Sequence, residues 1–337
     1  MDVVFIKEPG EIELLDVPEP AVKDGEALLK IKYCGICGSD IATYTGNQPF
    51  ASYPRIPGHE FSAEIVDIED NDLGLKAGMI VTANPYFNCG HCYPCSKGKV
   101  NCCESNETMG VQRDGSFAEY ITMPIERIVN GRGLSAQTLA LIEPFSIGYH
   151  AINRGNIKNK DNVLVIGAGP IGIFAMLSAK LAGAKVTIVD MLKERLDLAK
   201  SMGADQIVNV SQKTLAKEVE KLTNGNGMDA CVEAVGHANT FLQCIENAAF
   251  GGKIILIGNG KTETKFNHSI LLKKELDVYG SRNSLYDFKP LIDKVKTNNL
   301  DIEKIITHIY AKEDVLQAFK ELNNNDGSMA KVLIKFN

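Results

Sequence analysis

The chain has 337 residues, with 42 acidic and 36 basic side chains and nine cysteines. Its net charge of −6 argues against a nucleic-acid partner, which would favour a basic face. The chain does not start with a basic segment followed by an apolar one, and no apolar run has membrane-spanning length. We therefore expect a cytoplasmic protein without a membrane partner. In that reducing setting clustered cysteines favour a metal site over disulfides, and the length is sufficient for two domains.

The first third of the chain predicts an irregular β-rich domain. Short apolar runs bounded by Gly, Pro, Asn or Asp are typical of strands, and they occur at residues 26–33, 61–68, 79–85 and 116–124. From about residue 150, strand runs alternate with helical stretches, which predicts a doubly wound parallel α/β sheet. The strand runs are 162–166, 185–190, 229–236 and 253–260, and the helical stretches include 193–204 and 240–252. The chain then predicts two amphipathic helices and a last strand, at 285–297, 312–323 and 331–336.

A cysteine-rich segment runs from Cys89 to Cys103. Its C-x2-C-x2-C-x7-C spacing selects Cys89, Cys92, Cys95 and Cys103. Two-residue gaps allow neighbouring thiolates to reach one cation, and four sulfurs complete a closed tetrahedral shell. We therefore expect a structural zinc here. The spacing alone leaves Cys102 open as the fourth ligand, whereas His91 is interpreted as a solvated loop residue.

A G-x-G-x-x-G motif follows the strand run at 162–166 and opens a helical stretch, which is the context of a dinucleotide-binding turn. The motif spans residues 167–172, and its candidate cofactor-binding residues are Gly167, Gly169, Pro170, Ile171 and Gly172. The first glycine allows the tight turn, the second allows the backbone to approach a pyrophosphate, and the third allows close helix packing. The helix N-terminus then offers unpaired N–H groups to the phosphates, so we expect a bound dinucleotide.

The next strand run ends in Asp190, which is placed to accept hydrogen bonds from the ribose hydroxyls. A carboxylate at this point repels a 2′-phosphate, so NAD should be preferred to NADP. Arg195 follows five residues later and is either a phosphate contact or part of a solvated helix face.

A second set of metal-binding residue types is spread through the sequence. Cys37 follows a strand in YCGICGSD, His59 and Glu60 precede the next strand in PGHE, and Glu143 lies in LIEPFSIG. Glycines beside Cys37 and before His59 indicate tight, exposed turns, where ligands tend to be presented. Cys34 has no second C-x-x-C pair nearby and is interpreted as a core residue.

The ordered motifs GICGSD, PGHE, CGHCYPC, DGSFAEY, IEP and VIGAGPIG resemble the zinc-dependent medium-chain alcohol dehydrogenase family along essentially the whole chain. Ethanol-oxidising members carry a cysteine at the position of the IEP glutamate. In this feature the chain resembles the polyol and sugar-acid branch of the family. The resemblance implies a Rossmann NAD-binding domain at 148–284, inserted in a β-rich, GroES-like catalytic domain at 1–147 and 285–337. It also implies a homodimer or homotetramer.

The resemblance implies two zinc ions per chain. The catalytic zinc would be held by Cys37, His59 and Glu143, with Glu60 beside it and able to approach the metal. The four spaced cysteines would hold the structural zinc, which leaves Cys102 as a bystander. Ser39 would take the proton of the substrate hydroxyl. Ala42 replaces the histidine that often passes this proton onward in the family, so a water chain or Glu60 must serve.

The substrate implied by the resemblance is a small hydroxylated molecule. Arg113 and Arg282 fall in segments that border the substrate site in this family, and a guanidinium is a natural partner for a carboxylate. An L-galactonate or L-gulonate type of sugar acid is therefore expected, with a neutral polyol such as sorbitol, or threonine, as alternatives. A zinc-ribbon nucleic-acid binder would leave the dinucleotide motif unused. An NAD-binding sensor of the same fold would be expected to lose Cys37, His59 or Glu143.

Overall fold

The computed structural model describes residues 1–260 and 263–336. The chain divides into two compact units. Unit 1 comprises Met1–Glu143 and Phe288–Asn337, and unit 2 comprises Pro144–Asp287. The middle of the chain is thus inserted into a unit formed by both ends. The unit boundaries fall at 143/144 and 287/288, whereas the sequence interpretation put them at 147/148 and 284/285.

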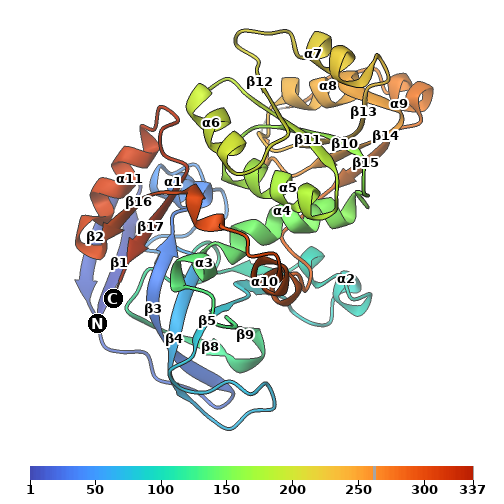
Figure 1. The fold of residues 1–337 in the computed structure, drawn as a ribbon. Coiled ribbons are helices and arrows are strands. Elements are labelled where there is room, and N and C mark those ends of the chain that lie inside the picture. Colours follow the sequence, from blue (N-terminus) through green and yellow to red (C-terminus); the bar gives the residue numbers. More distant parts are fainter. Residues whose placement is uncertain (261–262, 337) are drawn as a thin grey trace. The chain divides into compact units, whose positions relative to one another are not determined.

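Unit 1 is built around a mixed sheet in the order β16-β17-β3-β4-β5-β9, with β8 also paired to β3 (Figure 1). The strands of unit 1 are β1 Asp2–Glu8, β2 Glu11–Asp16, β3 Glu26–Gly35, β4 Glu60–Ile68, β5 Ile80–Ala83, β6 Tyr86–Phe87, β7 Glu107–Thr108, β8 Tyr120–Pro124, β9 Ile128–Asn130, β16 Ile306–Ala311 and β17 Lys331–Lys335. Alternating burial along β3 explains why this segment forms a strand with one face toward the core. The last strand of the chain, β17, lies directly beside β3.

Short helices connect these strands. They are α1 Gly38–Tyr44, α2 Tyr93–Ser96, η1 Val100–Cys102, η2 Ile125–Arg127, α3 Ala136–Ala140, α10 Phe288–Thr297, η3 Ile302–Ile305, η4 Lys312–Asp314 and α11 Val315–Asn323. A buried aromatic cluster joins the two ends of the chain. The Phe319 ring on α11 makes edge contacts with Tyr44 and Phe117, at 5.7 and 6.0 Å between centroids. Such contacts add to the apolar burial that holds α11 on the core.

Unit 2 contains a six-stranded parallel sheet in the order β12-β11-β10-β13-β14-β15. Its strands are β10 Asn162–Ile166, β11 Lys185–Asp190, β12 Gln206–Asn209, β13 Met228–Glu233, β14 Ala248–Leu256 and β15 Asp277–Gly280. Its helices are α4 Ile142–Arg154, which begins in unit 1, and α5 Pro170–Leu181, α6 Lys193–Ser201, α7 Leu215–Thr223, α8 Ala238–Asn247 and α9 Ser269–Lys274. Helices α5 and α6 lie on one side of this sheet and α7 and α8 on the other (Figure 1). The strand order reverses between β10 and β13, which is where doubly wound folds bind ligands.

One predicted helix was too long. The helical stretch expected over residues 240–252 ends at Asn247, and the strand β14 begins at Ala248. Gly251 adopts a positive φ of 72°, which a helix cannot accommodate, and adjacent glycines weaken helical propensity. Pairing with β13, with an irregularity between Met228 and Ala230, supplies the hydrogen bonds instead.

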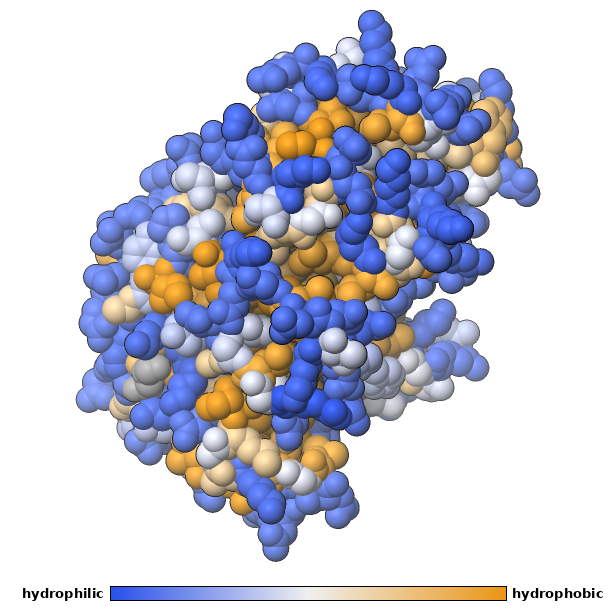
Figure 2. All heavy atoms as spheres, viewed as in Figure 1, coloured by the Kyte–Doolittle hydropathy of each residue, from blue (hydrophilic) through white to orange (hydrophobic). Residues whose placement is uncertain are grey.

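The face shown in Figure 2 is mostly hydrophilic, and its apolar areas are interrupted by polar and charged side chains. Among residues 1–260 and 263–336, we find no helix with the length and apolar character needed to span a membrane.

Truncation of Phe319 to alanine should destabilise unit 1. The side chain is 0% exposed, and replacing a buried phenylalanine with alanine costs about 3–5 kcal/mol in unfolding free energy. For a unit of this size, the melting temperature should fall by on the order of 10 °C, measured by differential scanning calorimetry. Phe250→Ala is the matched control because its side chain is 68% exposed, so its melting temperature should stay close to that of the native protein. Equal shifts for the two variants would contradict the assignment of Phe319 to the core.

Candidate active site

The four spaced cysteines meet in one loop of unit 1. The sulfur atoms of Cys89, Cys92, Cys95 and Cys103 all lie within 4.8 Å of one another. None of them forms a disulfide. The short helix α2 begins directly after Cys92 and carries Cys95, and the turn after η1 brings Cys103 back to the group. Four thiol donors at this separation fit a tetrahedral zinc and leave no coordination position for a substrate.

Backbone groups favour the thiolate form of Cys89, whereas burial raises the pKa of Cys95 to about 11. Hydrogen bonds from the backbone N–H groups of His91 and Cys92 lower the pKa of Cys89 to about 6, because they stabilise the charged form. The His91 side chain is exposed and lies 2.9 Å from the Cys89 carbonyl oxygen, outside the sulfur group. Cys102 ends η1 and is not part of the sulfur group, which fits its interpretation as a bystander.

A second group of possible ligands forms where β3 ends and β4 begins. The side-chain donors of Cys37, His59 and Glu60 lie within 4.8 Å of one another. Asp40, a residue of the GICGSD motif that the sequence interpretation did not single out, joins the two turns. Its carboxylate accepts hydrogen bonds from the backbone N–H groups of Cys37 at 2.8 Å and Gly58 at 3.1 Å. The acidic residue of this motif therefore fixes the two turns that present the thiol and the imidazole.

Two glycines make this geometry possible. Gly58 has a φ of 100°, and a Cβ atom there would overlap Phe117 and Cys34. Gly35 lies opposite Glu60 in the β3–β4 register, and a Cβ atom there would overlap the Glu60 carboxylate. Larger residues would therefore displace His59 at the first position and Glu60 at the second.

Glu143 is the second residue of helix α4, is 3% exposed and accepts a hydrogen bond from the Tyr86 hydroxyl. Burial raises the pKa of Glu143 to about 7, and nearby Glu60 adds to this, although His59 acts in the opposite direction. Burial and the Glu143 charge also hold the pKa of Tyr86 well above its usual value, so the phenol remains a donor.

Lys331 is the main residue that sequence reasoning missed. Its ammonium is buried and lies 2.6 and 2.9 Å from the two carboxylate oxygens of Glu60. Lys331 opens β17, 271 positions after Glu60, and no short motif connects the two residues. The one available signal was a lysine at the start of a predicted buried strand, where a charged residue needs a partner.

The donor set of this second group fits a metal cation. Burial disfavours a charged imidazole, yet the neighbouring Cys37, Asp40 and Glu143 charges raise the pKa of His59 well above its usual value. The group thus concentrates buried negative charge that a cation would compensate. Within residues 1–260 and 263–336, the buried atoms His59 Nδ1 and Ser39 Oγ have no hydrogen-bond partner. A thiolate, an imidazole and a carboxylate form a donor set that zinc accepts.

In unit 2, the glycine motif forms the expected turn between β10 and α5. Gly167 has a φ of 102°, and a Cβ atom at Gly172 would overlap the Gly167 carbonyl oxygen. Gly169 caps the helix without a side chain, and a Cβ atom there would meet nothing within 4 Å. Pro170 and Ile171 form the first turn of α5. The backbone at this helix N-terminus is therefore open to an approaching phosphate.

Asp190 ends β11 beside this turn. Its carboxylate accepts hydrogen bonds from the backbone N–H groups of Ala168 and Met191, each at 2.8 Å, and from Leu192 at 3.0 Å. These donors fix the orientation of the carboxylate at the carboxyl end of the sheet. The Arg195 guanidinium lies 3.8 Å from Asp190 Oδ2, so this arginine is associated with the Asp190 carboxylate.

The two arginines expected near the substrate belong to different units. In unit 1, the Arg113 guanidinium lies 3.6 Å from the Phe87 ring centroid and 3.7 Å from a Glu107 carboxylate oxygen. It lines a pocket of about 330 Å³, whose lining residues include none of the four candidate catalytic ligands. In unit 2, Arg282 is exposed and follows β15. Cys34 is buried, with its sulfur 3.0 Å from Ser116 Oγ.

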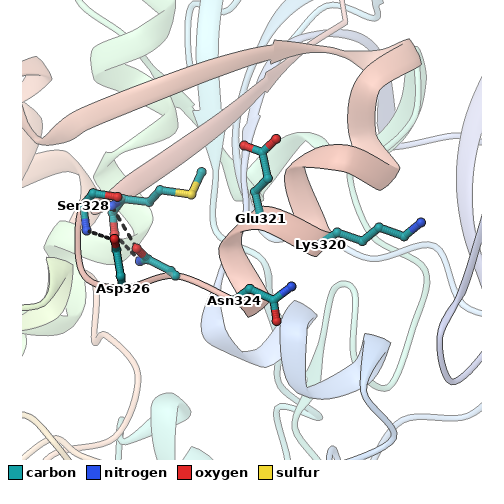
Figure 3. A pocket seen from close by; sticks show the side chains of 7 residues that line it. Lys320, Glu321, Asn324, Asp326 and Ser328 are labelled. Carbon is teal, nitrogen blue, oxygen red and sulfur yellow. Dashed lines mark hydrogen bonds between the residues drawn. The ribbon is translucent and has the colours of Figure 1, made fainter.

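Another pocket of unit 1, of about 350 Å³, lies at the end of α11 (Figure 3). Asp326 accepts a hydrogen bond from the Ser328 backbone N–H, and Lys320 points away from both residues. Its lining residues include neither metal-binding group, so we assign it no chemistry.

Comparisons with known proteins agree with this architecture. Residues 23–132 match the alcohol dehydrogenase GroES-like domain, and residues 170–297 match the zinc-binding dehydrogenase family. L-galactonate-5-dehydrogenase of Escherichia coli (strain K12) is 34% identical over 100% of this chain and 99% of its own. Sorbitol dehydrogenase of Halalkalibacterium halodurans is 32% identical over 96% of each chain. The solved structure of the short chain alcohol dehydrogenase (rspB) from E. coli CFT073 complexed with cofactor NADH has a TM-score of 0.93 and 31% identity, covering 100% of this chain and 99% of its own.

The chain therefore belongs to the zinc-type medium-chain alcohol dehydrogenase family. It combines a GroES-like domain with a parallel-sheet Rossmann domain, as the sequence predicted. The family and the NADH complex support NAD-dependent alcohol dehydrogenase activity on a small-molecule substrate, with zinc and NAD as cofactors.

Protein purified without chelator should contain two zinc ions per chain. Cys92→Ser should lose about one zinc equivalent, because three thiols and a hydroxyl form a weaker zinc site than four thiols. Elemental analysis of the purified variant measures this loss. Cys102→Ser is the matched control and should retain both ions, since Cys102 is not part of the sulfur group. Loss of zinc in the control, or one zinc per chain in the active native protein, would contradict the assignment.

The native protein should use NAD with a higher kcat/KM than NADP. Asp190→Asn keeps the size of the side chain but removes the charge that repels a 2′-phosphate. The ratio of kcat/KM for NAD to kcat/KM for NADP should therefore fall roughly tenfold, or about 1.4 kcal/mol. Steady-state kinetics with both cofactors would measure the change. Arg195→Ala is the companion variant, and it should leave NAD preferred. A native preference for NADP would show that Arg195 governs the choice.

Proposed function

We propose that this dehydrogenase oxidises a secondary hydroxyl of a sugar acid or polyol, with L-galactonate or L-gulonate as the favoured type. The substrate loses a proton and a hydride to become a ketone, and NAD+ accepts the hydride. The observation that carries this proposal is buried Glu143, whose charge acts on His59 beside the Cys37–His59–Glu60 group. Similarity over the whole chain to an L-galactonate dehydrogenase supports the sugar-acid substrate.

In this proposal Cys37, His59 and Glu143 hold the catalytic zinc. A bound zinc supplies Lewis acidity, which lowers the pKa of a substrate hydroxyl. The Ser39 hydroxyl is suited to accept the released proton, because it is buried and has no hydrogen-bond partner within the described part of the chain. Glu60 is less suited to pass that proton onward than the sequence suggested, since both its oxygens accept hydrogen bonds from Lys331. We therefore assign the onward transfer to solvent.

Arg113 is proposed to bind the carboxylate of the substrate. Its contact with Glu107 is long, at 3.7 Å, and both side chains are partly exposed, so this ion pair contributes little and can exchange. The Phe87 ring holds the guanidinium from one face, which keeps it ordered for a bidentate contact. Arg282, on unit 2, is proposed as a second contact for the substrate or the cofactor.

A neutral polyol is the second candidate. Arg113 already has Glu107 and Phe87 as partners, and such an arginine can serve a purely structural role. The matched sorbitol dehydrogenase is almost as similar to this chain as the L-galactonate enzyme.

Arg113→Ala should lower kcat/KM for L-galactonate by roughly ten- to a hundredfold, because a charge-assisted hydrogen bond contributes about 1.5–3 kcal/mol. The same variant should leave kcat/KM for sorbitol nearly unchanged, since sorbitol has no carboxylate. Steady-state kinetics on both substrates would distinguish a sugar acid from a neutral polyol as the native substrate. Arg132→Ala is the control, because Arg132 is a partly exposed arginine of unit 1 that pairs with Asp293. Equal losses on both substrates, or sorbitol as the better native substrate, would favour the neutral polyol.

A further inference from the structure

The segment of residues 84–88 contacts both metal-binding groups. The Asn88 amide nitrogen lies 3.9 Å from the sulfur of Cys95, and the Tyr86 hydroxyl donates a hydrogen bond to Glu143. The regular structure of the segment is short, because β6 has two residues and forms a two-stranded sheet with β7. Such a small sheet is marginally stable by itself, so the position of Tyr86 depends on contacts from elsewhere in unit 1.

Arg127, the last residue of η2, supplies those contacts. Its guanidinium donates to the Tyr86 carbonyl oxygen at 2.5 Å and to Asn88 Oδ1 at 3.3 Å. The guanidinium also lies 4.2 Å from the centroid of the Phe87 ring. The backbone carbonyl oxygen of Arg127 accepts a hydrogen bond from the Asn84 N–H at 2.9 Å. One residue therefore holds most of the segment.

The Arg127 guanidinium is held here at a cost in free energy. Burial lowers the pKa of Arg127, and the Arg113 charge on the Phe87 ring adds to this, although Glu126 acts in the opposite direction. Its acceptors on the segment are a carbonyl and an amide oxygen, which carry no full negative charge. What these bonds supply is direction, because the planar guanidinium fixes two acceptors in one geometry.

The consequence of this geometry reaches the second metal-binding group through Tyr86. The Tyr86 side chain is 8% exposed and Glu143 is 3% exposed, so their hydrogen bond is shielded from water. The charges of His59 and Lys331 also act on Glu143, but a hydrogen bond constrains the direction of a carboxylate more than a charge does. Residues that orient a metal ligand typically contribute about ten- to a hundredfold to metal affinity.

We propose that Arg127 is a positioning residue for the second metal-binding group, which holds residues 84–88 so that the Tyr86 hydroxyl orients Glu143 for metal binding. This inference rests on the proposed function, in which Glu143 is a ligand of the catalytic metal. The direction of the effect separates positioning from simple electrostatics. Removal of a positive charge near a cation site would by itself strengthen cation binding, whereas loss of positioning weakens it.

The test uses the full-length protein with zinc in the four-cysteine loop and Co²⁺ in the second group. The visible absorption of the bound Co²⁺, followed during competition with a chelator, gives the Co²⁺ affinity without turnover. Arg127→Met and Tyr86→Phe should each weaken Co²⁺ binding by roughly tenfold. The double variant should lose about as much as either single variant, because both changes break the same link. Arg132→Met is the control and should bind Co²⁺ like the native protein, since Arg132 pairs with Asp293 instead.

Native or tighter Co²⁺ binding in Arg127→Met would overturn the proposal. A double variant that loses roughly a hundredfold, the product of two independent effects, would also overturn it. If Arg127→Met does not fold, Arg127→Gln replaces it and the same outcomes apply. Failure of the proposed function gives a different result: native protein that binds no Co²⁺ beyond the four-cysteine site, or Glu143→Gln with native Co²⁺ affinity.

Discussion

The compensation of buried negative charge is the constraint on which unit 1 depends. Asp40, Glu60 and Glu143 are all buried beside the Cys37 thiol, and isolated charges in such surroundings are very costly. Backbone N–H groups donate to Asp40, the Lys331 ammonium donates to Glu60 and the Tyr86 hydroxyl donates to Glu143. The Lys331 charge also acts on Glu143. The cluster can therefore exist in a stable fold and still have the surplus negative character that attracts a cation.

The two metal-binding groups are assembled from the chain in different ways. The cysteine loop takes all its donors from one short segment with identical ligands, so it can form a closed shell by local folding alone. The second group draws on two turns and the start of α4, and the sheet must form before its donors meet. A site assembled by long-range contacts can include residues that control the ligands as well as the ligands themselves. Asp40 and Lys331 have this character, because each orients a donor or the turn that carries it.

This difference explains which parts could be predicted from the sequence. The parallel sheet of unit 2, the glycine turn and the four-cysteine loop follow from short-range patterns, since period, spacing and flanking glycines are visible in a single sequence. Lys331 was not predictable, because its contact with Glu60 requires β17 to pair with β3, almost 300 positions away in the chain. The end of the helix at Asn247 was missed for a related reason, since the pairing of β14 with β13 overrides local helical propensity.

In unit 2, a carboxylate is again stabilised by neighbouring polar groups, but these groups are of a different kind. Asp190 is oriented by three backbone N–H groups and faces Arg195 only at 3.8 Å, so its carboxylate is fixed mainly by hydrogen bonds. Such a carboxylate keeps its orientation while remaining available to ribose hydroxyls. Glu60 is bound instead by a full positive charge at two oxygens. A carboxylate held by N–H donors can thus still bind a ligand, whereas Glu60 faces a buried ammonium as well as the Cys37 and His59 donors.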